Sequence, residues 1–241
     1  MVVESKEKQH ILSQLKKVVD TRFDKIEAPW INDFIAEYYR DVACEDLHDR
    51  ELDDLYGAAI AHWNLAQSRP PAATQIKVYN PSFETHGWQS AYSVIEIVTE
   101  DHPFLVNSLT MNLNENGLTC HLVVHPVIDV CRDGKGLLQQ KKTKKGLISE
   151  AMIRLEVDLQ SAEAGGLKRL REQMMRVVLH NAAVTEDWKP CLAKLDAAVA
   201  DLQTNSSTEK IIHHEETMDF LAWLGDGNFL FLGCREYELV K

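Results

Sequence analysis

Two histidines, His121 and His125, have the four-residue spacing of a helical metal site. On a helix, four residues advance only about 6 Å along the axis, so two imidazoles can hold one ion. The surrounding residues 118–130 are rich in β-branched side chains and predict a strand. In a strand, four residues span about 13 Å. We therefore expect these histidines to be solvated or hydrogen-bonded, and we expect no metal site here.

Two charged runs carry weaker signals. The run His213-His214-Glu215-Glu216 falls in a predicted helix, where adjacent side chains diverge by about 100°. It is typical of an ordinary charged helix face. The lysine-rich run at 141–145 is typical of a solvated loop, and contact with an acidic partner is the alternative.

The cysteines do not indicate catalysis. They are odd in number, widely spaced and without a Cys-x-x-Cys pair, which favours a reducing cytoplasm over a secreted disulfide framework. Cys120 and Cys234 lie in predicted strands between apolar residues, as inert buried thiols do. No Gly-x-Ser-x-Gly elbow, Walker loop or Gly-x-Gly-x-x-Gly after a strand is present. A free-standing hydrolase or transferase is therefore the least favoured function. The five cysteines of the chain are Cys44, Cys120, Cys131, Cys191 and Cys234.

Asp101 is the carboxylate with the most informative position. It follows a predicted strand at 91–100, and Pro103 suits the first turn of the helix that comes next. A side chain at this junction can cap the helix, which we favour. Alternatively, the backbone N–H groups of the first turn can receive the carboxylate of a ligand.

The elements that position these residues begin with a helical subdomain, residues 1–68. Three stripes of apolar residues recur with helical period, and Pro29 suits the first turn of the second helix. The stripes are Ile11, Leu12, Leu15, Val18 and Val19; Ile31, Phe34, Ile35, Tyr38 and Val42; and Leu52, Leu55, Ala59, Trp63 and Ala66. Residues 69–88, which open with Arg69-Pro70-Pro71, predict a linker and lead-in.

Residues 89–241 predict an α+β domain. The strand at 91–100 precedes a helix that ends at Gly117, a strand at 118–130, a polar connection at 132–149 and a strand at 153–159. In the last of these, apolar residues alternate with Arg154, Glu156 and Asp158, so we expect one face in the core and the other in water. Helices at about 167–178, 185–203 and 207–224, a turn at 225–228 and a final strand at 229–239 follow. The order β-α-β-β-α-(extra helices)-β matches a ferredoxin-like βαββαβ sheet with helices on one face.

The composition limits the kinds of partner that the chain can bind. The chain is 45% hydrophobic and 26% charged, as globular domains are, and its formal net charge of −11 argues against nucleic-acid binding. No apolar run approaches the roughly 18 residues of a membrane span, and the N-terminus has no apolar signal core. We expect neither a nucleic acid nor a membrane as partner.

Three motifs resemble the N-terminal region of the large bacterial NAD-specific glutamate dehydrogenases. They are DHPFLVNS at 101–108, NGLTCHLVVHP at 116–126 and DGNFLFLGCREY at 226–237, and the similarity runs through most of residues 80–241. The resemblance implies that the chain is a fragment of a long polypeptide that oxidises L-glutamate to 2-oxoglutarate and ammonia with NAD. It also implies ACT-like modules, which are ferredoxin-like and in other enzymes bind amino acids and pair across subunits. No catalytic residue and no cofactor site in this chain follows from it; NAD belongs to the full-length enzyme.

The strand-to-helix turn also resembles the Asp-Arg-Pro-Gly-Leu-Leu signature of amino-acid-binding ACT domains. This chain has Phe104 where that signature has glycine, which lets a ligand approach the backbone closely. The substitution favours a non-catalytic regulatory or assembly segment, with the rest of the polypeptide and other subunits of a homo-oligomer as partners. The alternative is a module that senses a small amino acid. Its candidate effector-binding residues are Asp101, His102, Phe104, Leu105, Val106 and Asn107. Whether the leading helices pack on the sheet or elsewhere is left open.

Overall fold

The computed structural model is a mixed α+β structure that describes residues 6–140, 146–186, 188–204, 214–229, 231–235 and 237. It divides into two units, Met1–Val178 and Leu179–Lys241, and each is considered by itself. In the described residues, no helix is both long and apolar enough to cross a membrane.

The first unit opens with the range predicted as a helical subdomain, and we keep that name for the described helices in it. Its helices are α1 (Lys6–Arg22), α2 (Glu27–Tyr38), α3 (Cys44–His48) and α4 (Leu52–Ala66). The three apolar stripes correspond to α1, α2 and α4, which is confirmed by the burial of Leu15, Ile31 and Ala59. The short α3 has only Leu47 buried and carried no periodic signal.

The sheet and its connections follow. The elements are β1 (Gln75–Tyr79), α5 (Phe83–His86), β2 (Ser93–Glu100), α6 (Leu105–Glu115), β3 (Cys120–Val124), β4 (Val127–Arg132), β5 (Leu138–Gln139), β6 (Leu147–Val157) and α7 (Gly166–Thr185). The range 69–88, expected to be a linker and lead-in, contains β1 and α5. Gly117, expected to end a helix, has φ 71° and directly follows the last turn of α6.

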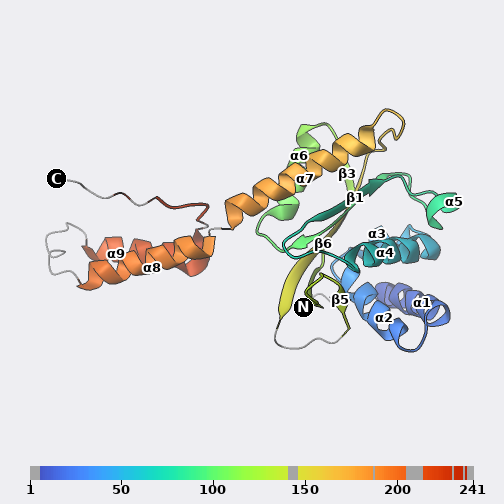
Figure 1. Ribbon diagram of the computed structural model, residues 1–241, viewed down its shortest axis with the longest axis horizontal. Helices are drawn as coiled ribbons and strands as arrows, with labels where there is room; N and C mark the ends of the chain where they lie inside the picture. Colours follow the sequence, from blue (N-terminus) through green and yellow to red (C-terminus); the bar gives the residue numbers. More distant parts are fainter. Residues whose placement is uncertain are drawn as a thin grey trace. The chain divides into compact units, whose positions relative to one another are not determined.

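Strand β6 organises a fully antiparallel sheet of six strands in the described part of the chain (Figure 1). One side of β6 pairs with the whole of β2 through residues 150–157, and the other side pairs with β3 and β4 in succession. The strand predicted at 118–130 is divided into β3 and β4 at Pro126, whose nitrogen cannot donate to a ladder. The Pro126 carbonyl still accepts from the Met152 N–H at 3.0 Å, which keeps the two segments beside β6.

The edge beside β2 is occupied by β1, which precedes β2 in the chain. A ferredoxin-like order places the last strand of the fold at that edge, so the predicted order is not confirmed. Of the predicted final strand at 229–239, residues 229, 231–235 and 237 are described, and none of them is in a strand. The remaining four lie outside the described residues.

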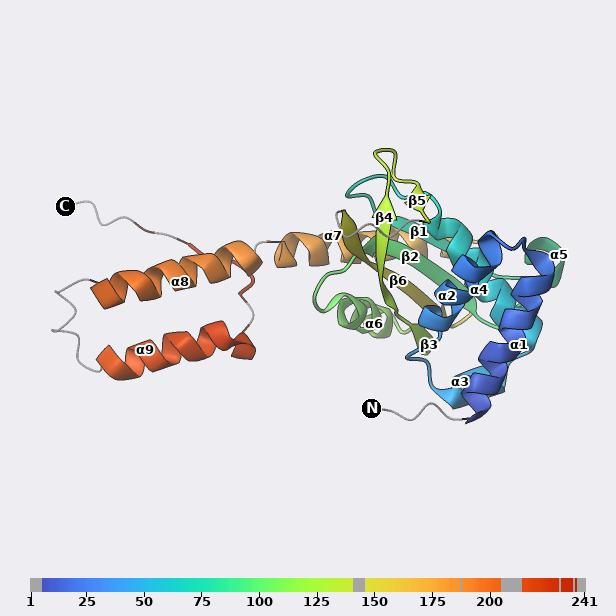
Figure 2. The same cartoon turned by 90° about the horizontal axis from the view of Figure 1, so that it is seen from below.

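Both faces of the sheet are covered by helices, which corrects the expectation of helices on one face only (Figure 2). Ile97, Ile153 and Leu155 pack with α6 and α7 on one face. Val98 and Met152 pack with the helical subdomain on the other, so the leading helices cover the sheet. The expectation that the second face of β6 is wet is therefore wrong.

The second unit contains two further helices in its described part, α8 (Trp188–Thr204) and α9 (His214–Trp223). They correspond to the helices predicted at 185–203 and 207–224. The segment Leu224–Asn228 follows α9, and Asp226 and Gly227 in it have non-helical backbone angles, with Gly227 at φ 81°, which confirms the predicted turn. Phe220 and Trp223 stack with centroids 6.2 Å apart and remain about half exposed.

Candidate functional site

The predicted effector turn joins β2 to α6. Phe104 occupies the N-cap position of α6, with φ 61° in the left-handed region, and its side chain makes no cap hydrogen bond. The expected capping by Asp101 is therefore wrong; its backbone N–H donates instead to the Ser149 carbonyl at 3.2 Å. The chain thus keeps a glycine-like backbone at position 104, at the cost of strain on a residue with a Cβ.

The six candidate effector residues separate into three environments. Leu105 is a core residue, 1% exposed, and packs with the α6–α7 layer. Asp101, Phe104 and Asn107 are exposed, while His102 and Val106 are half-buried. The Phe104 side chain is 56% exposed, so most of its ring lies in solvent.

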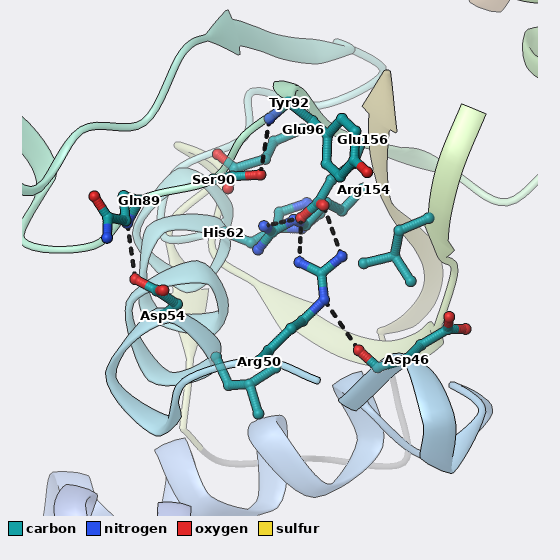
Figure 3. Close-up of polar contacts among 12 residues, drawn as sticks. Asp46, Arg50, Asp54, His62, Gln89, Ser90, Tyr92, Glu96, Arg154 and Glu156 are labelled. Atoms are coloured by element: carbon teal, nitrogen blue, oxygen red, sulfur yellow. Dashed lines mark hydrogen bonds and ion pairs between the residues drawn. The ribbon is translucent and has the colours of Figure 1, made fainter. Parts of the chain in front are cut away.

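A layer of buried charge lies on the opposite face of the sheet, under the helical subdomain (Figure 3). Arg154 on β6 stands directly across the strand pair from Glu96 on β2. Glu156, two residues further along β6, points to the same face and accepts from Arg154 Nη2 at 2.5 Å. Arg50, between α3 and α4, donates Nη1 and Nη2 to the two oxygens of Glu156 at 2.9 and 2.8 Å. We call Arg50, Glu96, Arg154 and Glu156 the interlayer cluster.

Burial and pairing set the protonation of this cluster in opposite directions. Burial raises the pKa of Glu96, and the charge of Arg154 only partly opposes that. Burial acts the same way on Glu156, but Arg154 and Arg50 outweigh it, and the pKa of Glu156 is lowered. Tyr79 donates its hydroxyl to Glu96 Oε1 at 3.0 Å, and the Arg154 guanidinium lies 4.7 Å from the Trp88 ring centroid. Glu156, which faces two arginines, therefore stays ionised, whereas the raised pKa of Glu96 means that its protonated form is favoured by burial.

His62 on α4 completes the contact between helix and sheet. Its Nε2 lies 3.1 Å from the Ile97 carbonyl, which can only accept, so Nε2 carries the proton. Nδ1 then accepts from the Tyr38 hydroxyl at 3.0 Å. Burial lowers the pKa of His62 to about 3, so this imidazole is neutral near pH 7. It joins two layers and has no free nitrogen for catalysis.

A second buried cluster anchors the segment after α4. Glu150 on β6 is fully buried and accepts from Arg132 Nε and Nη2, both at 2.6 Å. Arg69, which is 1% exposed, donates Nε to Glu150 Oε1 at 2.9 Å. Its backbone N–H donates to the Gly136 carbonyl at 2.9 Å. Arg69, predicted to begin a linker, is thus fixed to the sheet.

The two histidines singled out in the sequence, His121 and His125, do not share a bonding partner. His121 bonds Asp158 at 2.8 Å and stacks on Tyr92, with centroids 4.1 Å apart, so its prediction as a hydrogen-bonded histidine is confirmed. Burial lowers the pKa of the His125 imidazole, which Asp101 partly opposes. Across the described ranges, no three His, Cys, Asp or Glu side chains converge as a metal site would require.

The thiols differ from one another. Cys120 is half-buried, and burial raises the pKa of its thiol, as expected for an inert cysteine. Cys234 is exposed, so the expectation of a buried thiol there is wrong, because the described residues 231–235 are not in a strand. His213 and residues 141–145 lie outside the described residues.

The interlayer cluster was not predicted from the sequence because alternating charged and apolar residues fit both a strand with one exposed face and a strand covered on both faces. Alternating charges on β6 predict a wet face when nothing covers it. A signal was nevertheless present: three amphipathic helices preceded the sheet and needed an apolar surface to cover. Had they been placed on the sheet, Arg154 and Glu156 would have required buried counter-charges.

Comparisons with known proteins agree with one another. The family model described as "Glutamate dehydrogenase, ACT1 domain" matches residues 34–174. The NAD-specific glutamate dehydrogenase of Halomonas elongata is 36% identical over 243 residues, covering 99% of this chain and 15% of that protein. The Pseudomonas aeruginosa protein of the same name is 30% identical over 216 residues, covering 88% and 13%. A third, from Mycobacterium tuberculosis, is 26% identical over 183 residues, covering 73% and 11%. The chain spans about 15% or less of the length of these relatives.

Proposed function

Because this chain belongs to the ACT1-domain family of glutamate dehydrogenase, we propose that it is a non-catalytic regulatory or assembly segment of an NAD-specific enzyme. In this proposal NAD binding and the oxidation of L-glutamate to 2-oxoglutarate and ammonia take place elsewhere in the same cytoplasmic polypeptide. The partners of the segment are the remainder of that polypeptide and the other subunits of a homo-oligomer. We also propose that the sheet is a variant of the ACT fold in which β1 occupies the edge beside β2.

The observation that supports it most directly is the use made of buried ionisable groups. A catalytic acid, base or nucleophile must reach a substrate. Glu150, Arg154 and Glu156 are 0–2% exposed. Glu156 pairs with Arg50, between α3 and α4, and with Arg154 on its own strand, while Glu150 pairs with Arg69, which follows α4. The pairs with Arg50 and Arg69 link the helical subdomain to the sheet, and this structural use of buried charge suits a regulatory or assembly segment.

The test measures catalytic activity and oligomeric assembly separately. The isolated 241-residue chain, supplied with L-glutamate and NAD, should form no NADH. The full-length enzyme lacking this segment should keep its NAD-dependent chemistry per folded active site and change its oligomeric mass or its response to effectors. Sedimentation velocity and steady-state kinetics measure both. Turnover by the isolated chain, or an unchanged mass and an unchanged effector response after deletion, would refute the proposal.

Amino-acid sensing is kept as a second function because Phe104, at the N-cap position of α6, makes no side-chain cap hydrogen bond. The N–H groups of an uncapped helix terminus attract carboxylates. A thermal-melt screen of the chain against the twenty amino acids and 2-oxoglutarate tests it. A ligand at one hundred times its dissociation constant adds about 2.7 kcal/mol, or roughly 5–10 °C in a chain of this size. Asp101→Ala should remove the shift and Glu115→Ala, at the other end of α6, should not; loss in both variants or in neither would contradict this site.

A further inference from the structure

A cleft of about 450 Å³ lies between α2, α4 and the strands β4 and β5. We call it the α2–β5 cleft. Ten of its fifteen lining residues are apolar, and five are polar. A volume between about 300 and 1,000 Å³ with mostly apolar walls and a few polar groups is typical of small-molecule sites.

The deep part of the cleft is aromatic. Trp30 meets Trp63 edge to face with centroids 4.6 Å apart, and Phe34 lies 4.9 Å from Trp63. Trp63 and Phe34 are buried, whereas Trp30 is half-buried, so part of the Trp30 ring is accessible. Met152 and Val130 of the sheet also line the cleft and are buried. This part suits a compact apolar body, and the rings offer π-faces to a cation.

The polar lining is acidic. Asp33, Glu37 and Asp129 contribute three carboxyl groups, and none of the fifteen lining residues is Lys, Arg or His. Glu37 pairs with Arg40, and Asp129 accepts from the Ser149 hydroxyl at 2.6 Å. Asp33 is exposed, and in the described part of the chain it has no ion-pair partner. Among the fifteen lining residues, an anion therefore meets carboxylates and no cationic side chain, whereas a cation meets Asp33 and Asp129, which have no ion-pair partner among the described residues.

We propose that the α2–β5 cleft binds a small organic cation, an ammonium group on an aromatic or branched apolar body. The apolar body lies against Trp30 and Phe34, and the ammonium lies near Asp33 and Asp129. Since the cleft is bounded by α2, α4 and the sheet, such a ligand stabilises the helical subdomain on the sheet. The site is separate from the β2–α6 turn, and the proposal does not rest on the function proposed above.

Three probes that share a phenylethyl group and differ in the charge of its substituent test the charge preference on the full chain. They are 2-phenylethylamine, 2-phenylethanol and 3-phenylpropionate, which carry positive, zero and negative charge. Isothermal titration calorimetry gives the affinities, and quenching of tryptophan fluorescence reports occupancy beside Trp30. The amine should bind at least about tenfold more tightly than the alcohol, because a cation over an aromatic ring near carboxylates gains over 1.4 kcal/mol. The propionate should bind most weakly.

Variants assign the binding to the cleft. Asp33→Asn combined with Asp129→Asn should weaken the amine about tenfold and leave the alcohol unchanged. Asp49→Asn makes the same change at an exposed position outside the cleft, so it should leave all three affinities unchanged. Equal affinities for the amine and the propionate would overturn the proposal. So would an absence of saturable amine binding, or an equal loss in the Asp49→Asn chain.

Discussion

Replacing Arg154 by methionine tests whether the interlayer cluster stabilises the fold by charge compensation. Methionine keeps a long apolar stem in the space that the arginine occupies but carries no charge. Arg154 is 2% exposed, bonds Glu156 and stands across from Glu96. After the change, Glu156 still has Arg50, whereas Glu96 has the Tyr79 hydroxyl and no facing guanidinium. The variant therefore leaves one buried carboxylate without its counter-charge.

The magnitude follows from that imbalance. Removing one partner of a buried ion pair costs about 3–5 kcal/mol, because the remaining charge is desolvated and uncompensated. For a chain of this size that is a fall of roughly 6–20 °C in melting temperature. The double variant Arg154→Met, Glu96→Gln removes the stranded charge and should recover about 2 kcal/mol or more. Lys168→Met breaks a pair whose lysine is 82% exposed, and should cost less than about 1 kcal/mol.

The assay is urea unfolding followed by circular dichroism and tryptophan fluorescence, at pH 7 and again at lower pH. The folded-state pKa of Glu96 is raised, so the stability due to its neutral form is fully present below the unfolded pKa and is lost as pH rises through the folded pKa. The deficit of Arg154→Met should therefore shrink as pH falls from 7, and the double variant should show less of this dependence. A deficit below about 1 kcal/mol for Arg154→Met, or a double variant no more stable than the single one, would refute charge compensation.

Three further perturbations have expected outcomes that the same unfolding assay measures. Gly57→Ala should cost about 1–3 kcal/mol by overpacking, because the new Cβ would lie 2.5 Å from Trp88; Gly134→Ala meets nothing within 4 Å and is the control. Phe104→Gly should raise the free energy of unfolding by about 1 kcal/mol by relieving a positive φ, while Phe83→Gly, at an exposed phenylalanine without that backbone, should not. His62→Gln should reduce acid sensitivity: the folded pKa is about 3, below the usual 6.5, so His62 contributes stability above pH 6.5 that is lost as pH falls. Between pH 6.5 and 5 the native chain should lose about 2 kcal/mol more than the variant, and an equal loss in both would contradict a neutral buried His62.

The sequence determined the elements whose pattern is local. Helices α1, α2 and α4 follow from apolar stripes, and the end of α6 follows from Gly117, since helical period and glycine conformation are set within one or two turns. Motifs in the sequence also identified the family, which the family model and the relatives confirm. The resemblance depends on the order of side chains and not on their positions in space.

Only the tertiary structure decided which faces are buried. Arg154 and Glu156 alternate with apolar residues, as a half-wet strand would require, yet the helical subdomain covers them. Likewise, β1 lies at the edge beside β2 although residues 69–88 read as a linker, and Arg69 is fixed by Glu150, eighty-one positions along the chain. The α2–β5 cleft likewise joins residues 26–37 to residues 128–140. A strand's alternation marks two faces, but what packs on each depends on contacts between distant segments, which no local pattern encodes.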